Sequence, residues 1–290
     1  MTSGPADPPL AAVREAVGRA LAEDVLPLGD LTASLVPATT TARAHIVARH
    51  RGVVAGRLCA LEAFAQVDPA VTVDWRLDDG SPVEAGSVVA TVCGPLRSIL
   101  TAERTALNFL CHLSGVATAA RRYVDVVTAA NPATRVLDTR KTTPGLRALE
   151  KAAVRAGGAH NHRGNLSEAV LVKDNHLGGL TIADAVDRAR RWWPGRMVEV
   201  ECDRPDQVTQ AVDAGAAAVL LDNMTPDEVA TCVRSVRGHP GGGGVLIEVS
   251  GGVTLENAPR YASAGADLVS VGAITHSAPV LDLGLDLEVG

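Results

Sequence analysis

The pattern of apolar positions in the first 118 residues predicts a mixture of helices and strands. Residues 10–23 carry apolar side chains at helical spacing, whereas 43–49, 71–77 and 88–93 alternate or run apolar as strands do. Residues 98–118 (SILTAERTALNFLCHLSGVAT) have the period of a long helix, which Gly115 is expected to interrupt. We expect this helix to join two domains.

From about residue 135 the pattern changes to short apolar runs that end in polar residues. Six such runs follow one another: RVLDTRK, AVLVKD, MVEVECD, AAVLLDN, VLIEVSGG and DLVSVGA. Helical patterns separate them at 145–156, 181–193, 205–214, 226–236 and 254–264. Continuous apolar runs that alternate with amphipathic helices indicate buried parallel strands. Because nearly every run ends in a chemically useful residue, we predict a (β/α) barrel rather than an open doubly wound sheet.

The segment 78–94, DDGSPVEAGSVVATVCG, has the glycine-punctuated look of a lipoyl or biotinyl carrier. No lysine stands at its turn to take the cofactor, so we interpret it as a structural β hairpin.

Composition narrows the function without identifying it. With 47% hydrophobic and only 2% aromatic residues, the chain can fill a large aliphatic core. A net charge of −6 argues against a nucleic-acid or membrane-surface binder. The 27 basic residues include three lysines, and all three, Lys141, Lys151 and Lys173, fall in one stretch of the chain. An anionic partner is therefore expected to be small and locally bound.

Cysteine usage and the absence of targeting signals favour a cytoplasmic protein. The five cysteines are scattered and form no CxxC or metal-ligand spacing, which fits a reducing compartment. The N-terminal residues show no signal-peptide pattern, and no apolar stretch approaches the roughly 20 residues of a membrane span.

The ends of the predicted strands supply the candidate chemistry. In a barrel these ends converge on one face, whatever their distance in sequence. Cations suited to a polyanionic substrate come from the strand ends and the following loop. Carboxylates suited to a hard divalent cation or a developing positive charge come from two later strands. The set comprises Asp138, Arg140, Lys141, His162, Arg163, Lys173, Glu201, Asp222, Ser250, Gly251, Gly252 and Gly272.

Simpler readings remain open for several of these residues. Asp222 and Asn223 could cap a helix that begins near Thr225, and Ser250-Gly251-Gly252 could be a turn. Glycine-rich ends of late barrel strands also bind phosphates through backbone N–H groups. We do not interpret His160 and His162 as a zinc pair without a third ligand, and we expect His160, His176 and His276 to be structural or supporting.

An ordered series of motifs resembles the quinolinate phosphoribosyltransferase family over nearly the whole chain. The motifs are EDVLPLGDLT at 23–32, GVVAG at 52–56, DGSPVEAG at 79–86, ILTAERTALNFLCHLSGVAT at 99–118, DTRKTTPGLRALEKAAVRAGG at 138–158, NHR at 161–163, VKDNH at 172–176, EVE at 199–201, LLDN at 220–223, and SGG and SVGA near the end. The chain departs from the family at two places: the segment AGGAHNHRGNLSE has His160 and Asn165 where smaller or apolar residues are expected, and the early loop EDVLPLGD is slightly altered. Neither removes a charged site residue.

The resemblance implies a fold, a reaction and an assembly. The expected fold is an N-terminal α/β sandwich-like domain at 1–118, a seven-stranded (β/α) barrel at 119–275, and a C-terminal segment at 276–290 that returns to the first domain. The implied reaction joins quinolinate to 5-phosphoribosyl 1-diphosphate with Mg²⁺ and yields nicotinate mononucleotide, CO₂ and diphosphate, a step of NAD biosynthesis. The implied assembly is a homodimer, or dimers assembled further as in a hexamer.

The resemblance also implies residue roles. Arg140, His162, Arg163 and Lys173 would bind the quinolinate carboxylates, Lys141 would bind the ribosyl donor, and Thr139 belongs to the same substrate-binding set. Glu201 and Asp222 would face the ribose and Mg²⁺, and with Lys141 they form the expected catalytic group. Ser250, Gly251, Gly252, Val271, Gly272 and Ala273 would surround the donor's terminal phosphate. Arg104 would enter the partner's site across the dimer.

Two alternatives stay open at this stage. A related phosphoribosyltransferase that takes nicotinate, or a relative from a metal-transport operon, would need fewer cations around the pyridine ring, whereas this chain has Arg140, Arg163 and Lys173 together. A non-catalytic sensor of a phosphorylated metabolite would be expected to have lost Glu201, Asp222 or Lys141, and all three are present.

Overall fold

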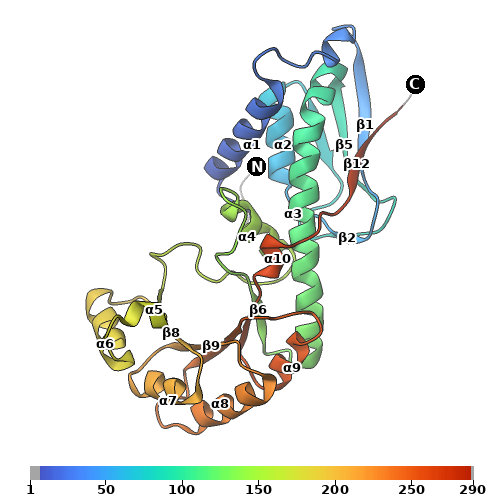
Figure 1. Ribbon diagram of the computed structural model, residues 1–290. Helices are drawn as coiled ribbons and strands as arrows, with labels where there is room; N and C mark the ends of the chain where they lie inside the picture. The colour runs from blue at the N-terminus through green and yellow to red at the C-terminus, as the bar shows by residue number, and fades with distance from the viewer. Residues whose placement is uncertain (1–6, 289–290) are drawn as a thin grey trace. The chain divides into compact units, whose positions relative to one another are not determined.

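The computed structural model describes residues 7–288 of the chain, which divide into two compact units (Figure 1). The first unit contains the residues up to Arg121, Lys141–Gly158, and the residues from Ala273 onward. The second unit contains Arg122–Arg140 and Ala159–Gly272. Residues 141–158, placed in the barrel domain by the sequence, thus belong to the first unit. No helix in the described part of the chain is both long and apolar enough to cross a membrane.

An antiparallel sheet in the order β12-β1-β5-β3 forms the centre of the first unit, with helices against it (Figure 1). The C-terminal strand β12 pairs with β1, so the end of the chain joins the sheet that the beginning builds. The strands and helices are α1 (Leu10–Val25), the 3-10 helix η1 (Ala33–Leu35), β1 (Thr41–Ala48), β2 (Gly52–Val53), α2 (Arg57–Val67), β3 (Thr72–Trp75), β4 (Pro82–Val83), β5 (Val88–Pro95), α4 (Arg147–Ala156), α10 (Ala273–His276) and β12 (Leu283–Leu287). The first part of the long helix α3 (Leu96–Ala130) also belongs here.

Two local predictions for the first unit are wrong. The expected hairpin at 78–94 does not form, because β4 pairs with β2 whereas β5 pairs with β1 and β3. Helix α3 continues through Gly115 instead of being interrupted there. A Cβ at Gly115 would come within 2.2 Å of the Pro279 carbonyl oxygen, so the glycine allows the C-terminal segment to pass against the helix.

The second unit is a six-stranded parallel sheet in the order β6-β11-β10-β9-β8-β7. In Figure 1 the helices α6 to α9 follow one another along its outer side. The elements are β6 (Arg135–Leu137), β7 (Val170–Val172), α5 (Asp174–Leu177), α6 (Ile182–Trp192), β8 (Val198–Cys202), α7 (Pro205–Asp213), β9 (Ala218–Asp222), α8 (Pro226–Gly238), β10 (Leu246–Ser250), α9 (Ala258–Ser263) and β11 (Leu268–Ser270). All six strands coincide with the apolar runs identified in the sequence.

The strand order agrees with a barrel-like sheet. The first strand, β6, pairs with the last, β11, and the two edge strands, β6 and β7, are consecutive in the chain, as in a sheet that curls into a barrel. The other edge of β6 forms a single parallel bridge, Leu137 to His160. Within the described residues, this parallel sheet therefore has six strands and one further bridging position, and the predicted count of seven barrel strands is not confirmed.

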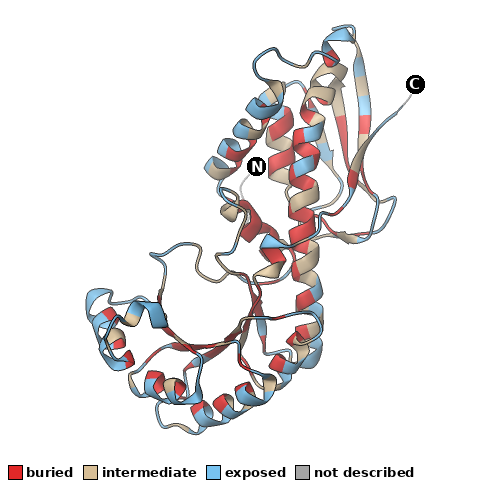
Figure 2. Cartoon of the chain, viewed as in Figure 1, coloured by how far each residue is buried: buried red, intermediate tan, exposed pale blue. Residues whose placement is uncertain are grey.

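Side-chain alternation separates the two faces of this sheet. One face consists of apolar residues such as Val200, Leu221, Ile247, Val249 and Val269, which are at most 1% exposed. These side chains pack under helices whose buried residues are also apolar (Figure 2). The opposite face carries the polar strand residues and becomes the candidate site.

Candidate active site

The register of the parallel strands places the predicted site residues on one face. Residues in lateral register point to the same side of a sheet, and every second residue along a strand does too. Glu201 is in register with Leu220, and Leu220 with Glu248. Ser250 is in register with Asp222. Glu201, Asp222, Glu248 and Ser250 therefore share the face opposite the helices.

The strand β6 and the loop at 161–163 are tied together by Asp138, which is fully buried. Its Oδ1 accepts the backbone N–H of His162 at 2.8 Å, and its Oδ2 accepts the side-chain amide of Asn161 at 2.6 Å. The Asp138 backbone N–H in turn donates to the His160 carbonyl oxygen at 3.1 Å. Two motifs over 20 positions apart in the sequence, DTRK and NHR, thus form one piece of structure.

His162 lies against two buried carboxylates. Its Nε2 is 3.1 Å from Glu199 Oε2 and 3.4 Å from Glu248 Oε2. Glu199 and Glu248 are 1% and 2% exposed, and the Ser270 hydroxyl donates to Glu248 Oε1 at 2.6 Å. The other ring nitrogen, Nδ1, accepts the backbone N–H of Arg163 at 2.8 Å.

The protonation of this cluster follows from its burial and hydrogen bonds. Burial has the largest effect on the pKa of His162 and lowers it, but hydrogen bonds and charges of Glu199 and Glu248 outweigh it and raise the pKa, so the cluster of three side chains retains an additional proton. Burial also raises the pKa of Glu199 to about 7 against the lowering effect of His162. An imidazolium could not accept the Arg163 N–H at Nδ1, so the ring geometry conflicts with a second proton there. We assign the ring as the Nε2–H tautomer and the additional proton to the carboxylate pair.

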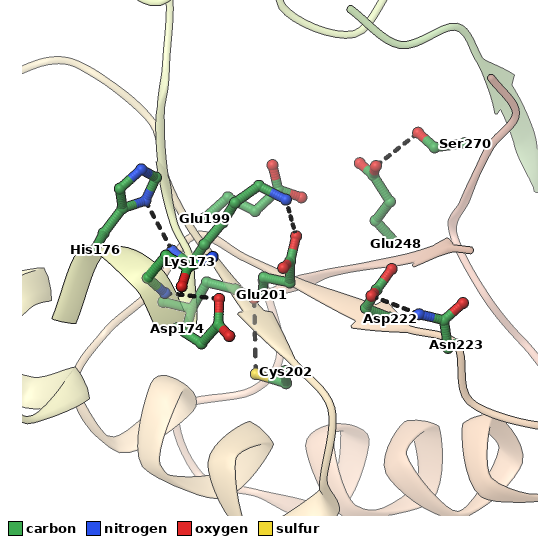
Figure 3. A network of polar contacts seen from close by, with 12 residues as sticks. Lys173, Asp174, His176, Glu199, Glu201, Cys202, Asp222, Asn223, Glu248 and Ser270 are labelled. Atoms are coloured by element: carbon green, nitrogen blue, oxygen red, sulfur yellow. Dashed lines mark hydrogen bonds and ion pairs between the residues drawn. The ribbon is translucent and has the colours of Figure 1, made fainter. Parts of the chain in front are cut away.

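Lys173, at the end of β7, makes an ion pair with Glu201, at the end of β8 (Figure 3). The side chain of Lys173 is 40% exposed and that of Glu201 is 16% exposed, so the ammonium remains accessible. The Lys173 backbone N–H donates to His176 Nδ1 at 3.1 Å, which fixes the turn into α5 and agrees with the supporting role expected of His176.

Asp222, at the end of β9, is held by its neighbour in the chain. The Asn223 side-chain amide donates to Asp222 Oδ2 at 2.7 Å (Figure 3). The simpler alternative, in which these residues cap α8, does not hold, because the cap of α8 is Thr225, whose hydroxyl accepts the Glu228 backbone N–H. Asp222 therefore does not cap α8.

Two guanidinium groups lie close enough to influence each other. Burial lowers the pKa of Arg163, the charge of Arg140 lowers it further, and the charge of Glu199 opposes both. Arg163 Nη1 also donates to the Ala169 carbonyl oxygen at 3.1 Å. Like charges held together in a partly buried place favour binding of an anion.

The glycines after β10 have the conformation of a turn, and the turn leaves open space. Gly251 and Gly252 have φ values of +86° and +60°. A Cβ at Gly251 would come within 2.2 Å of Asn223 Oδ1, whereas one at Gly252 would meet no described heavy atom within 4 Å. Gly251 is thus required for packing, and the space at Gly252 is open to a ligand.

Three predicted site residues lie in the first unit. These are Arg104, Lys141 and Ala273. Arg104 is exposed on α3. The Lys141 carbonyl oxygen accepts the Thr275 hydroxyl at 2.7 Å. Glu150, fully buried, fixes the same loop: its Oε2 accepts the Thr143 N–H at 3.1 Å and its Oε1 lies 2.8 Å from His112 Nε2.

The buried members of the cluster were not predicted from the sequence. Glu199, Glu248 and Ser270 were given no role, although a lone charged residue inside an apolar strand run, as in MVEVEC and VLIEVS, is a usable signal. In the described part of the chain, the group of three metal-ligating side chains with atoms within 4.8 Å of one another is His162, Glu199 and Glu248. It contains neither Glu201 nor Asp222, the predicted metal ligands.

The fold and the polar strand ends define an enzyme of the α/β-barrel class. Comparison with known proteins makes this specific. The family model described as quinolinate phosphoribosyl transferase, N-terminal domain, matches residues 30–114, and the one for the C-terminal domain matches 116–286. The chain belongs to the quinolinate phosphoribosyltransferase family.

Individual relatives agree with this assignment. The chain is 41% identical over 283 residues to a nicotinate-nucleotide pyrophosphorylase [carboxylating] of Mycobacterium leprae, covering 95% of this chain and 97% of that protein. It is 40% identical over 259 residues to the Rattus norvegicus protein of the same name, covering 88% and 85%. The structure of the nicotinate-nucleotide pyrophosphorylase from Francisella tularensis superposes with a TM-score of 0.91 at 37% identity, covering 99% of this chain and 100% of that one. The predicted family and α/β fold class are confirmed.

Proposed function

We propose that this protein transfers the phosphoribosyl group of 5-phosphoribosyl 1-diphosphate to quinolinate with loss of CO₂, forming nicotinate mononucleotide and diphosphate for NAD biosynthesis. The observation that carries the proposal is the pair of mutually repelling guanidiniums, Arg140 and Arg163, in the same unit as the accessible ammonium of Lys173. A dicarboxylate would relieve that repulsion. Family membership and the names of the relatives support the same reaction.

The residues divide by substrate. Arg140, His162, Arg163 and Lys173 serve the quinolinate carboxylates, and Lys141 and Thr139 serve the ribosyl donor. The terminal phosphate of the donor lies at Ser250-Gly251-Gly252 and Val271-Gly272-Ala273, where the open space at Gly252 supports a bound group. Glu201 and Asp222 face the ribose.

Glu201 and Asp222 also suit Mg²⁺. They present carboxylate oxygens from the ends of adjacent strands on the polar face. Magnesium in phosphate-handling sites binds to one or two carboxylates, with substrate phosphates and waters completing its shell. When bound, the ion would neutralise the diphosphate leaving group.

The chemistry follows from these positions. Diphosphate leaves C1 of the ribose, and the resulting oxocarbenium-like charge is stabilised by a nearby carboxylate, for which Glu201 and Asp222 are the candidates. The pyridine nitrogen attacks C1. The ring nitrogen then carries a positive charge. When the adjacent carboxylate departs as CO₂, the electron pair of the broken bond stays on the ring carbon, where the neighbouring positive nitrogen stabilises it until a proton takes the place of the carboxylate.

The active form is proposed to be a homodimer in which Arg104 enters the partner's site, with further association into a hexamer of dimers as a possible larger assembly. The exposed position of Arg104 on α3 supports this contribution. We place the enzyme in the cytoplasm, which its five free cysteines support.

The test is incubation of the purified protein with quinolinate, the ribosyl donor and Mg²⁺, with nicotinate replacing quinolinate as the control. We expect nicotinate mononucleotide and an equal amount of CO₂ from quinolinate. Turnover of nicotinate with none of quinolinate would contradict the proposal and favour the nicotinate-specific alternative. Binding of both substrates without turnover would favour a sensor.

A further inference from the structure

Two buried carboxylates on the polar face have no part in the proposed substrate contacts. Glu199 on β8 and Glu248 on β10 are almost fully buried, and they approach the same atom, Nε2 of His162, at 3.1 and 3.4 Å. Burying a charged group is unfavourable unless hydrogen bonds compensate it. A pair of buried carboxylates is therefore expected to have a structural or functional role.

The carboxylate of Glu248 is also held by a residue on the neighbouring strand. The Ser270 hydroxyl, 4% exposed as a residue, donates to Glu248 Oε1 at 2.6 Å, leaving Oε2 directed to the imidazole. Figure 3 shows the contact between Glu248 on β10 and Ser270 on the neighbouring strand β11. Position and orientation of this carboxylate are therefore fixed by two partners on separate segments.

The other ring nitrogen of His162 is hydrogen-bonded to the backbone of Arg163. Nδ1 accepts the Arg163 backbone N–H at 2.8 Å, and the His162 backbone N–H is bound to the buried Asp138. Both ring nitrogens thus contact protein groups: Nε2 the two carboxylates, and Nδ1 the backbone of the next residue. Turning the ring would break the hydrogen bond to the Arg163 backbone N–H and so shift the position from which the Arg163 side chain extends.

We propose that Glu248 and Glu199 are positioning residues that hold the imidazole of His162, which in turn fixes Arg163 for binding of the substrate dicarboxylate. His162 then serves the quinolinate side of the site by orienting its neighbour. This inference rests on the proposed function, since it assigns the carboxylates to one of the two substrates. The donor, assigned to other residues, should be little affected.

The same three side chains could in principle hold a cation, because their ligand atoms lie within 4.8 Å of one another. The hydrogen bond at Nδ1 argues against it. A neutral imidazole whose Nδ1 lone pair accepts a hydrogen bond carries its own hydrogen on Nε2, which leaves Nε2 no lone pair for a metal. A proton on Nε2, between the two carboxylates, fills the place that a metal would need.

The test compares Glu248→Leu with Glu248→Gln by measuring KM for each substrate and kcat. Leucine removes the acceptor, whereas glutamine can still accept from Nε2 and contact Ser270. We expect Glu248→Leu to raise KM for quinolinate by about tenfold to a hundredfold, because Arg163 would be slightly misplaced. KM for the donor should be nearly unchanged. Glu248→Gln should restore most of the loss, and Ser270→Ala should cause a smaller change of the same kind.

A matched control uses the same two strands without touching the carboxylate cluster. Asp267, directly before β11, accepts at Oδ2 the N–H of Ile247, the residue that precedes Glu248, at 2.8 Å, and it pairs with Arg237 at 2.6 Å. Asp267→Asn should weaken the packing of these strands, and its melting temperature reports that effect, but it should leave the ratio of the two KM values unchanged. If Glu248→Leu fails to fold, Ser270→Ala and Glu248→Gln carry the test.

A double-mutant cycle asks whether Glu248 acts through His162. Adding Glu248→Leu to His162→Phe should cost little more than His162→Phe alone, because the group through which it acts is gone. Additive effects, equal rises of both KM values, or an unchanged quinolinate KM in Glu248→Leu would overturn the inference. So would stoichiometric Mn²⁺ or Zn²⁺ binding that is lost in His162→Phe. A wild-type protein inactive on quinolinate would instead refute the proposed function.

Discussion

The charged residues at the strand ends of the second unit compensate one another while leaving cationic groups accessible. Lys173 is paired with Glu201 yet keeps 40% of its side chain exposed. Arg163 loses part of its basicity through burial and then through the charge of Arg140. An arriving anion would therefore find cations whose repulsion it reduces, which is a source of binding free energy.

Replacement of Lys173 by alanine should reduce kcat/KM by about a hundredfold or more while leaving the fold intact, because it removes a charge-assisted contact to an anion. Steady-state kinetics and circular dichroism check the two parts. The control is Arg191→Ala, which removes a cation from an exposed ion pair with Asp187 on α6 and should change neither. Near wild-type turnover of the Lys173 variant would contradict its assignment to the substrate.

Activity should require a divalent cation and disappear in excess EDTA, returning with added Mg²⁺. In Asp222→Asn, one of the two proposed ligands loses its charge, so the half-saturating Mg²⁺ concentration should rise by about tenfold or more. Asp227→Asn, on the exposed first turn of α8, is the control. Full turnover in EDTA would remove Glu201 and Asp222 from the role of metal ligands.

Strand-end chemistry could be predicted from the sequence because each apolar run ends visibly in a polar residue. Lys173, Glu201 and Asp222 were found this way, and the structure places them at the ends of β7, β8 and β9. Glu199 and Glu248 were missed because their role depends on tertiary contacts, namely those that both carboxylates make with His162. Nothing near either residue in sequence indicates that both reach His162, and only the folded sheet brings them together.

At the scale of elements, continuous apolar runs and helical periods were sufficient for the six parallel strands and the helices between them. Four short elements escaped prediction: β2, β4, α5 and α10 are four residues or fewer, too short to show a period. The equally short strands β6, β7 and β11 were found because they lie in apolar runs that end in polar residues. The strand at His160 could not be seen either, since it consists of one bridging residue. The hairpin at 78–94 failed because strand partners depend on tertiary pairing, which turn residues alone do not determine.

Gly115 provides a test at this scale. Gly115→Ala should destabilise the protein by about 1–3 kcal/mol, because the added methyl group would overlap the Pro279 carbonyl oxygen and force the segment from α3. The measurement is urea denaturation followed by circular dichroism. Gly238→Ala, also within a helix but with no described heavy atom within 4 Å of the added Cβ, is the control and should be neutral or slightly stabilising. Equal stability of the Gly115 variant and wild type would show that the segment can move at no cost.

At the scale of the whole molecule, the chain passes between its two units more than once. Residues 141–158 return to the first unit, and β12 completes the sheet that β1 begins. The sequence pattern showed where mixed helices and strands give way to alternating strands and helices. It did not show that later segments rejoin the first unit, because helix α4 has the same apolar period whichever unit it packs in. Arg104 belongs to the first unit and Lys173 to the second.

The last prediction concerns the proposed dimer. If Arg104 serves the partner's site, Arg104→Ala and Lys173→Ala chains should each be nearly inactive alone and should regain activity when mixed. In a mixed dimer both substitutions fall in one site and the other site is whole. Random pairing of equal amounts gives mixed dimers as about half of the population, each with one intact site, so activity should recover to roughly a quarter of wild type, as the reciprocal contacts of a two-fold interface require. Mass labelling of the two chains must first establish that subunits have exchanged. Absence of recovery after proven exchange would mean that Arg104 acts within its own subunit or supports only the fold.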